Sequence, residues 1–327
     1  MTPEVLDRAL DVFLPHLAAR SEIHFYGGEP LLAFDLIRRA VTAVQRKNGG
    51  RRKIRFGLTT NGSLITDDIL QFIRDHRFRL LVSFDGLAQD RGRRRGSFGT
   101  LVPSLERLLD SPAVKVETNS VFTPNTVRHL SGSIRLIHEL GVENIHLAFS
   151  NLAPWPEPAL SALSKELAAT GRFAASWRKK TGRIPLVEFR SGKERGIMTC
   201  GGGTNRISVA PDGTVWGCHL FFDHFRGSLN SAESRFYSFG RLKEFVRSQR
   251  RIHPEITARY ASLRMTRFRT PDGPCRVCPE VSDCAICPLD AAAPGTEIGR
   301  IPRWTCRIAK ALRAERERFL AKIPSRH

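Results

Sequence analysis

Apolar and polar residues along the first 150 positions alternate between a helical period and short apolar runs typical of buried strands. The predicted helices are residues 2–17, 32–45, 67–75, 101–109 and 127–140, and the predicted strands are residues 22–26, 54–59, 79–84, 114–121 and 144–149. Strands that alternate with helices form parallel sheets. The pattern therefore predicts an α/β fold organised as a barrel or partial barrel.

Glycine-rich and polar residues stand where these predicted strands end. Gly27 and Gly28 allow a ligand to approach the backbone closely, and Glu29 adds a carboxylate. Further hydrogen-bonding side chains follow the other strands: Asn61, Ser63, Ser83, Asp85 and Asn119. Ordinary turn chemistry explains each of them singly. Their recurrence on successive strand ends favours a ligand site, because such folds bind ligands at that edge.

Two histidines, His24 and His146, lie inside the apolar strands. We interpret them as hydrogen-bonded core residues rather than as catalytic ones.

Composition adds a strong positive charge. The chain has 327 residues, 41% of them hydrophobic, and 52 basic residues against 32 acidic ones leave a net charge of +20. The sequence contains neither an apolar stretch of about 18 residues nor a signal peptide, so we expect a cytoplasmic protein without a membrane span. A basic nucleic-acid-binding module is an alternative, based on stretches such as 51–53 and 91–95. Arginine is spread over the whole chain, which makes nucleic acid an unlikely partner.

Cysteines are confined to the C-terminal part of the chain. All seven lie between Cys200 and Cys306, and four of them form the run Cys275-x2-Cys278-x5-Cys284-x2-Cys287. Clustered cysteines in a cytosolic protein are metal or cluster ligands more often than disulfides. Zinc is an alternative to iron-sulfur clusters, but zinc ribbons separate their Cys-x2-Cys pairs by about 15–20 residues. The short gap here favours clusters.

A hairpin is predicted between two of these cysteines. Residues 207–209 and 214–216 have strand character, and Pro211-Asp212-Gly213 forms the turn between them. Such a hairpin would bring Cys200 and Cys218 close together.

The motif Gly27-Gly28-Glu29-Pro30 resembles that of radical S-adenosylmethionine enzymes, in the branch that modifies peptides and proteins. The later motifs Thr60-Asn61-Gly62, Ser83-Phe84-Asp85-Gly86 and Asp90-x-x-Arg93 follow in the order of that branch. The resemblance implies that residues 27–30 hold the methionyl amino group of S-adenosylmethionine and that Asn61, Ser83 and Arg93 belong to the cofactor site. Arg91, Arg94 and Arg95 are alternatives to Arg93.

The cysteine pattern resembles the SPASM domain, which carries auxiliary iron-sulfur clusters. The resemblance implies two [4Fe-4S] clusters, one held by Cys275, Cys278, Cys284 and Cys306, the other by Cys200, Cys218 and Cys287. The family usually has three residues before the fourth cysteine of the central run, and here there are two.

The implied fold is a partial (β/α)6 TIM-like barrel that lacks its first strand, followed by a cysteine-rich SPASM domain. The barrel would comprise residues 1–190, the SPASM domain 191–310 and a C-terminal helix and tail 311–327. We expect the last helix, residues 303–319, to pack one side against the barrel.

The implied activity is maturation of a peptide or protein through hydrogen abstraction by a 5′-deoxyadenosyl radical. The family's Cys-x3-Cys-x2-Cys loop, which binds a third [4Fe-4S] cluster, is absent from this sequence. We therefore expect S-adenosylmethionine and that cluster only in a longer parent protein in which Met1 is internal, and expect the chain as given to be inactive. The alternative is a non-catalytic iron-sulfur scaffold or partner protein.

One residue departs from the sulfatase-maturing relatives. Their catalytic aspartate, directly after the cysteine that matches Cys218, is replaced here by His219. Modification of a ribosomally made peptide is therefore favoured over sulfatase maturation, and His219 is a weak candidate for a proton acceptor. The resemblance also implies an electron donor such as a flavodoxin or ferredoxin.

Overall fold

The structure is a computed structural model that describes residues 1–190, 201–244, 252–262, 268–287, 289 and 297–322. Cys200 lies outside the described residues. In the described part of the chain, no helix is both long enough and apolar enough to cross a membrane.

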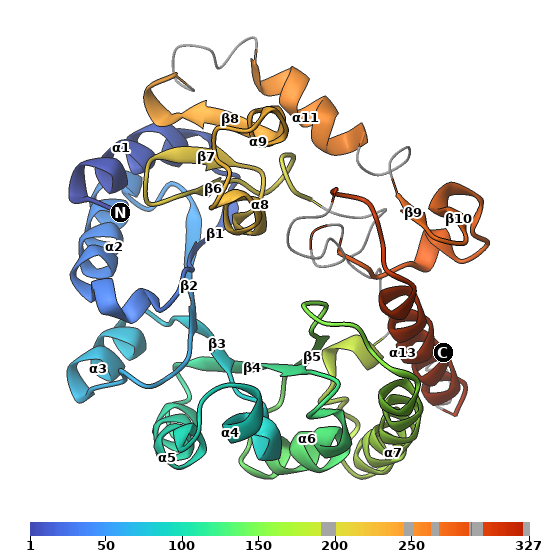
Figure 1. The fold of residues 1–327 in the computed structure, drawn as a ribbon. Coiled ribbons are helices and arrows are strands. Elements are labelled where there is room, and N and C mark those ends of the chain that lie inside the picture. Colours follow the sequence, from blue (N-terminus) through green and yellow to red (C-terminus); the bar gives the residue numbers. More distant parts are fainter. Residues whose placement is uncertain (191–200, 245–251, 263–267, 288, 290–296, 323–327) are drawn as a thin grey trace. The chain divides into compact units, whose positions relative to one another are not determined.

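A five-stranded sheet in the order β1-β2-β3-β4-β5 forms the centre of the fold (Figure 1). The strands are β1 Arg20–Phe25, β2 Lys53–Thr60, β3 Arg79–Ser83, β4 Lys115–Phe122 and β5 Ile145–Phe149. From β2 to β5, each strand pairs in parallel with its neighbour in the chain. The predicted parallel α/β arrangement is confirmed, and each strand lies within about two residues of its predicted position.

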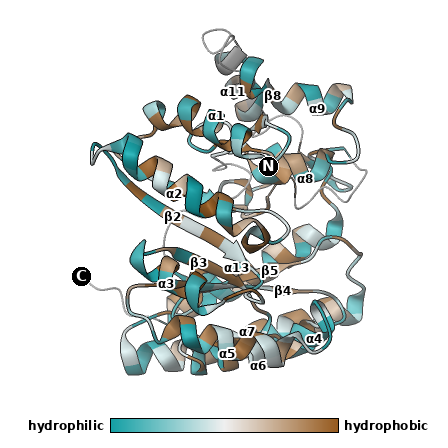
Figure 2. Ribbon diagram, turned by 90° about the vertical axis from the view of Figure 1, so that its left-hand side faces the viewer, coloured by the Kyte–Doolittle hydropathy of each residue, from teal (hydrophilic) through white to brown (hydrophobic). Residues whose placement is uncertain are grey.

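Helices connect the strands at the predicted places. They are α1 Pro3–Phe13, α2 Phe34–Asn48, α3 Asp67–Asp75, α5 Ser97–Leu109 and α6 Leu130–Glu139. Side chains set two of the starts, because the Thr2 and Thr66 hydroxyls accept the backbone N–H groups of Val5 and Ile69. In Figure 2 these helices alternate brown and teal, as expected for helices with one apolar face.

One long helix was missing from the prediction. Helix α7 spans Glu157–Thr181 and ends at Gly182, whose φ of +73° favours glycine. Its buried face combines leucines with small residues such as Gly171 and Ala174. Because small residues contribute little hydrophobicity, the helical period of apolar residues in this segment is weak. The sequence pattern therefore did not predict helix α7.

The two faces of the sheet differ in chemistry. The face covered by helices is apolar, and Leu80, Val82 and Phe122 on it are fully buried. The opposite face carries charged and polar side chains, among them Arg79 and Glu117.

By compactness the chain forms two units. One comprises residues 1–21, 35–54 and 193–303, and the other comprises 22–34, 55–192 and 304–327. All five strand ends and the loops after them belong to the second unit. This division by compactness differs from the predicted contiguous domains, whose boundaries at residues 190 and 310 stay a prediction.

The first unit contains a small antiparallel sheet with an aromatic core. The predicted hairpin is confirmed as β6 Ser208–Val209 and β7 Thr214–Trp216, with Gly213 at φ +82°, and β8 Ser238–Arg241 completes the sheet. Most of the aromatic side chains packed in this core come from three helices: α8 His219–Phe225, α9 Ala232–Tyr237 and α11 Ile252–Ser262. The Tyr260 hydroxyl donates to the Tyr237 carbonyl at 2.6 Å and accepts from the Gly217 N–H at 3.0 Å.

The last helix, α13 Arg303–Ala321, packs in the second unit against α7, as expected. Arg307 forms an ion pair with Glu157 at 2.7 Å, and Phe319 lies against Phe189 with ring centroids 5.3 Å apart. Gly171 allows a close approach here, because a Cβ atom at this position would displace the Glu315 carboxylate.

We expect Phe319→Ala to lower the free energy of unfolding by about 3–5 kcal/mol, because the ring is 2% exposed and its removal leaves a cavity. Urea unfolding followed by circular dichroism measures the change. Ala314→Ser, on the exposed side of the same helix, is the control and should change stability by less than about 0.5 kcal/mol. Equal effects of the two substitutions would contradict the packing of α13 described above.

Candidate cofactor and substrate site

The Gly-Gly-Glu-Pro loop is fastened to the end of the neighbouring strand by the carboxylate of Glu29. One oxygen accepts from the Thr60 hydroxyl at 2.8 Å and from the Leu31 N–H at 3.1 Å, and the other accepts from the Asn61 N–H at 2.8 Å. These three hydrogen bonds hold the loop against the end of β2, and the role of Glu29 in cofactor binding stays a prediction.

Gly27 and Gly28 face open space. Both are exposed, and a Cβ atom added to either would meet nothing within 4 Å. Neither has a positive φ angle that would demand glycine. The protein's own packing therefore does not explain these two glycines, whereas a bound molecule lying against the backbone would.

A buried ion pair links the ends of the next two strands. Arg93 donates to both Asp85 oxygens, at 2.8 and 2.9 Å, and to the Asn119 carbonyl at 3.2 Å. Asp85 is 1% exposed and also accepts from the Val121 N–H at 2.8 Å. The bidentate geometry holds the guanidinium rigidly while 28% of the arginine side chain stays exposed. Among the four neighbouring arginines, Arg93 is thus the one directed to the strand ends.

Ser83, Asn119 and His146 form a row across the inward face of the sheet. Ser83 pairs in register with Asn119, and Asn119 pairs with His146. Paired residues in neighbouring strands point to the same face, and strands lie about 4.8 Å apart, so His146 is two strands from Ser83. The Ser83 hydroxyl makes no hydrogen bond within the described part of the chain.

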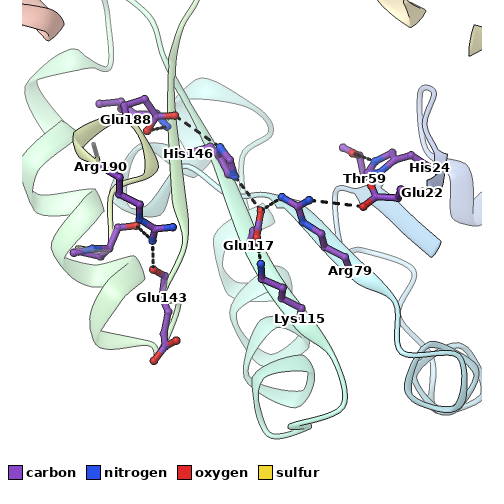
Figure 3. Close-up of polar contacts among 12 residues, drawn as sticks. Glu22, His24, Thr59, Arg79, Lys115, Glu117, Glu143, His146, Glu188 and Arg190 are labelled. Carbon is purple, nitrogen blue, oxygen red and sulfur yellow. Dashed lines mark hydrogen bonds and ion pairs between the residues drawn. The ribbon is translucent and has the colours of Figure 1, made fainter. Parts of the chain in front are cut away.

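Charged side chains form a second layer on the same face of the sheet (Figure 3), two residues before this row in strand β4. Glu117, 4% exposed, is its centre and contacts Arg79 at 2.6 Å, Lys115 at 3.0 Å and His146 at 3.0 Å. Burial raises the pKa of Glu117, but the hydrogen bonds from His146, Arg79 and Lys115 outweigh burial and hold the pKa well below its ordinary value. The carboxylate therefore stays ionised.

His146 lies between Glu117 and a second carboxyl group of opposite character. Its Nδ1 atom is 3.7 Å from Glu188, whose other oxygen accepts the Leu147 N–H at 3.0 Å. Burial raises the pKa of Glu188 to about 6, and the neighbouring charge of His146 acts in the opposite direction. The two carboxyl groups that flank the imidazole thus differ in their readiness to hold a proton.

The other histidine of the inward face, His24, belongs to a smaller cluster. It contacts Glu22 at 3.0 Å and Thr59 at 2.8 Å, and the hydrogen bond from His24 lowers the pKa of Glu22. Both histidines are thus hydrogen-bonded on the inward face, as interpreted from the sequence, but neither is fully buried: 34% of the His24 side chain and 28% of the His146 side chain are exposed.

Sequence reasoning missed Arg79, Glu117 and Glu188 as members of the site. The available signal was the presence of charged residues at alternate positions of an apolar strand, such as Lys115 and Glu117. A charge inside an apolar strand indicates an inward polar face rather than a solvated one.

The cysteine-rich segment consists of tight turns. Cys275–Val277 and Val281–Asp283 are 3₁₀ turns, and the N–H of Cys278 donates to the Cys275 carbonyl at 3.0 Å. Within the described residues, no three Cys, His, Asp or Glu side chains converge on a metal position. The cluster ligands, including Cys200 outside the described part, stay a prediction.

His219 is the first residue of α8, directly after Cys218. Its Nδ1 atom lies 3.8 Å from the Cys218 sulfur. The candidate base His219 thus lies beside Cys218, a predicted cluster ligand. Its role as a proton acceptor stays a prediction.

We expect Glu188→Gln to remove a pH dependence of stability. Since folded Glu188 keeps its proton to about pH 6 against an ordinary value of 4.5, the folded state binds more protons between these values. Stability from this group is therefore lost as the pH rises through that window, by at most about 2 kcal/mol. Urea unfolding from pH 4.5 to 7.5 measures it. If the free energy of unfolding varied with pH in the same way for the variant and the unmodified protein, the raised pKa of Glu188 would be contradicted.

Comparison with known proteins identifies relatives over most of the chain. The family model of the Radical SAM superfamily matches residues 1–147. Radical SAM cyclopropyl synthase TigE of Paramaledivibacter caminithermalis is 23% identical over 290 residues, which cover 80% of this chain and 59% of that protein. A cysteine-type anaerobic sulfatase-maturating enzyme of Clostridium perfringens is 24% identical over 306 residues, 85% of this chain and 80% of the enzyme.

Solved structures share the fold. Native anSMEcpe with bound AdoMet superposes with a TM-score of 0.77 at 18% identity, over 98% of this chain and 90% of that one. Streptococcus suis SuiB bound to S-adenosylmethionine gives 0.56 at 13% identity, over 94% and 70%. The fold is that of a partial TIM barrel with a C-terminal domain. Residues 1–147 thus match the radical S-adenosylmethionine superfamily, and the chain is similar in sequence to anaerobic sulfatase-maturating enzymes and in fold to anSMEcpe and SuiB.

Proposed function

We propose that this protein acts in the maturation of a peptide or protein by radical hydrogen abstraction from the substrate. The observation that carries the proposal is the strand-end site, in which an open glycine pair, a rigidly held arginine and a serine hydroxyl all belong to one compact unit. Because the chain spans 59% of TigE, the activity of the whole protein is part of the proposal.

The residues present fit S-adenosylmethionine. The carbonyls of Gly27 and Gly28 accept no hydrogen bond within the described residues and can receive the ammonium group of the cofactor. Arg93, held by Asp85, and the Ser83 hydroxyl supply donors for its polar groups, and Asn61 completes the edge of the site. When bound and reduced, the cofactor supplies the one-electron chemistry that abstracts hydrogen.

The cysteine-rich segment fits auxiliary iron-sulfur clusters. Thiolates on tight turns such as Cys275 to Cys278 can reach one cluster together. We propose the ligand sets Cys275, Cys278, Cys284, Cys306 and Cys200, Cys218, Cys287, with His219 available beside Cys218 to accept a proton. An electron donor of the flavodoxin or ferredoxin type would reduce the protein.

A peptide is the proposed substrate. One solved anSMEcpe structure contains a bound peptide, and one SuiB structure contains the precursor peptide SuiA. The barrel interior offers a polar face of suitable chemistry for a peptide, since its donors and acceptors include Asn119 and His146.

The direct test uses the protein produced from its chromosomal gene, purified without oxygen and supplied with iron, sulfide and a strong reductant. We expect it to cleave S-adenosylmethionine to 5′-deoxyadenosine and methionine, measured by liquid chromatography with mass detection. Absence of both products from protein that contains its clusters would overturn the proposed function.

Gly28→Val should separate cofactor binding from stability. The added side chain enters open space, so the free energy of unfolding should change by less than about 0.5 kcal/mol. The same side chain fills the proposed place of the cofactor, so affinity for S-adenosylmethionine should fall at least about tenfold by calorimetric titration. Gly99→Val, where a Cβ also meets nothing within 4 Å, is the control and should bind normally. Unchanged affinity of the Gly28 variant contradicts the site.

Metal analysis tests the clusters separately. Two auxiliary [4Fe-4S] clusters correspond to about eight iron and eight sulfide per chain, in addition to any cluster bound by other ligands. Cys278→Ala should remove about four of each and the matching part of the visible absorption. Stoichiometric zinc with little iron would contradict the assignment.

A further inference from the structure

Four arginines border the strand-end site and have no acidic partner. Arg91, Arg94 and Arg95 lie in the connection after β3, and Arg128 lies in the connection after β4; we call this set the arginine rim. All four are exposed, and none forms an ion pair within the described part of the chain. The Arg91 guanidinium is 3.3 Å from the His129 ring, so the two connections lie side by side.

Several other arginines of the same unit do have an acidic partner. Arg107, Arg183 and Arg307 are each paired with a carboxylate, namely Asp67, Glu143 and Glu157. Exposed Arg55, Arg77 and Arg172 also form no ion pair within the described residues, but they lie on separate segments of the chain. The rim therefore differs from the rest of this surface by gathering four uncompensated arginines on two adjacent connections.

The acidic residues nearest to the rim in sequence are already engaged. Asp85 is buried and held by Arg93, and Asp90 accepts the N–H of Phe98 at 2.8 Å at the start of α5. They leave the rim with an uncompensated positive charge in contact with water. Such a surface attracts an anionic partner.

An exposed leucine accompanies the charges. Leu87 is 53% exposed and lies just before α4, Gln89–Gly92. It also touches the start of α6, because a Cβ at Gly132 would lie 3.0 Å from it. The surface thus combines guanidinium groups with an aliphatic side chain, a combination that suits acidic and apolar side chains of a peptide. Single-stranded nucleic acid instead prefers exposed aromatic rings for stacking, and the one large aromatic side chain exposed among the described residues, Tyr26, belongs to the glycine loop.

We propose that the arginine rim is the docking surface for an acidic stretch of the peptide substrate. This inference rests on the proposed function and adds to it the charge of the substrate and the side of the site from which the peptide enters. Guanidinium groups bind carboxylates in bidentate fashion, and their position on the connections after β3 and β4 places the docked stretch beside Arg93 and Asn119.

The test measures binding of a fluorescein-labelled peptide made of Glu, Ser and Leu, with an otherwise identical peptide that has Gln in place of Glu. We expect fluorescence anisotropy to show binding of the acidic peptide alone, weakening as salt rises. The double variant Arg94→Gln, Arg95→Gln should weaken binding about tenfold. The control Arg55→Gln, Arg172→Gln removes the same charge from the same unit and should weaken it less than about twofold. Thermal unfolding checks that both variants fold.

Three results would overturn the proposal: equal weakening by the two double variants, equal binding of the Gln peptide, or tighter binding of an oligothymidine through the same arginines. The last result would assign the rim to nucleic acid. Protein that cleaves S-adenosylmethionine but does not bind the acidic peptide overturns the rim and leaves the proposed function standing. Protein that binds the acidic peptide through the rim but does not cleave S-adenosylmethionine overturns the proposed function and leaves the rim as a binding surface for acidic peptides.

Discussion

Parallel pairing of the strands is the constraint on which the site depends. Because β2 to β5 run in the same direction, the ends of these strands and the loops that carry Asn61 and Asp85 lie at one edge of the sheet, and Glu29 is bonded to the same edge. Two carboxylates then fasten these loops to one another. Glu29 joins the first loop to the second, and Asp85 with Arg93 joins the third loop to the end of β4. The site is therefore assembled from short bonds between neighbouring strand ends.

The hydrogen bonds of Glu29 show a structural role for the carboxylate of the Gly-Gly-Glu-Pro motif. Glu29 is the most conspicuous charged group of the Gly-Gly-Glu-Pro loop, yet protein donors occupy both of its oxygens. Other groups open to a ligand are backbone carbonyls and the arginine that Asp85 holds. A carboxylate that accepts several hydrogen bonds orders a loop at little entropic cost to later binding. Glu29 thus contributes to preorganisation of the loop.

The charged layer inside the barrel is a second consequence of the sheet. Glu117 gathers Arg79, Lys115 and His146 around one buried carboxylate, which stays ionised because three donors offset its loss of water. Glu188, with fewer donors, is left with a raised pKa on the other side of His146. The sheet thus has an apolar face covered by helices and a charged inward face.

The order of helices and strands, the strand-end motifs and the hairpin before Cys218 were determined by the sequence alone, because each depends on periodicity or turn chemistry within about a dozen residues. Helix α7 escaped detection, since small residues on its buried face weaken the period. The link between Glu29 and Asn61, the choice of Arg93 among four arginines and the contacts between Arg79, Glu117 and Glu188 were decided only by the tertiary structure. These contacts join residues far apart in the chain. Strand register and side-chain burial decide which charges meet, and neither can be read from a local pattern.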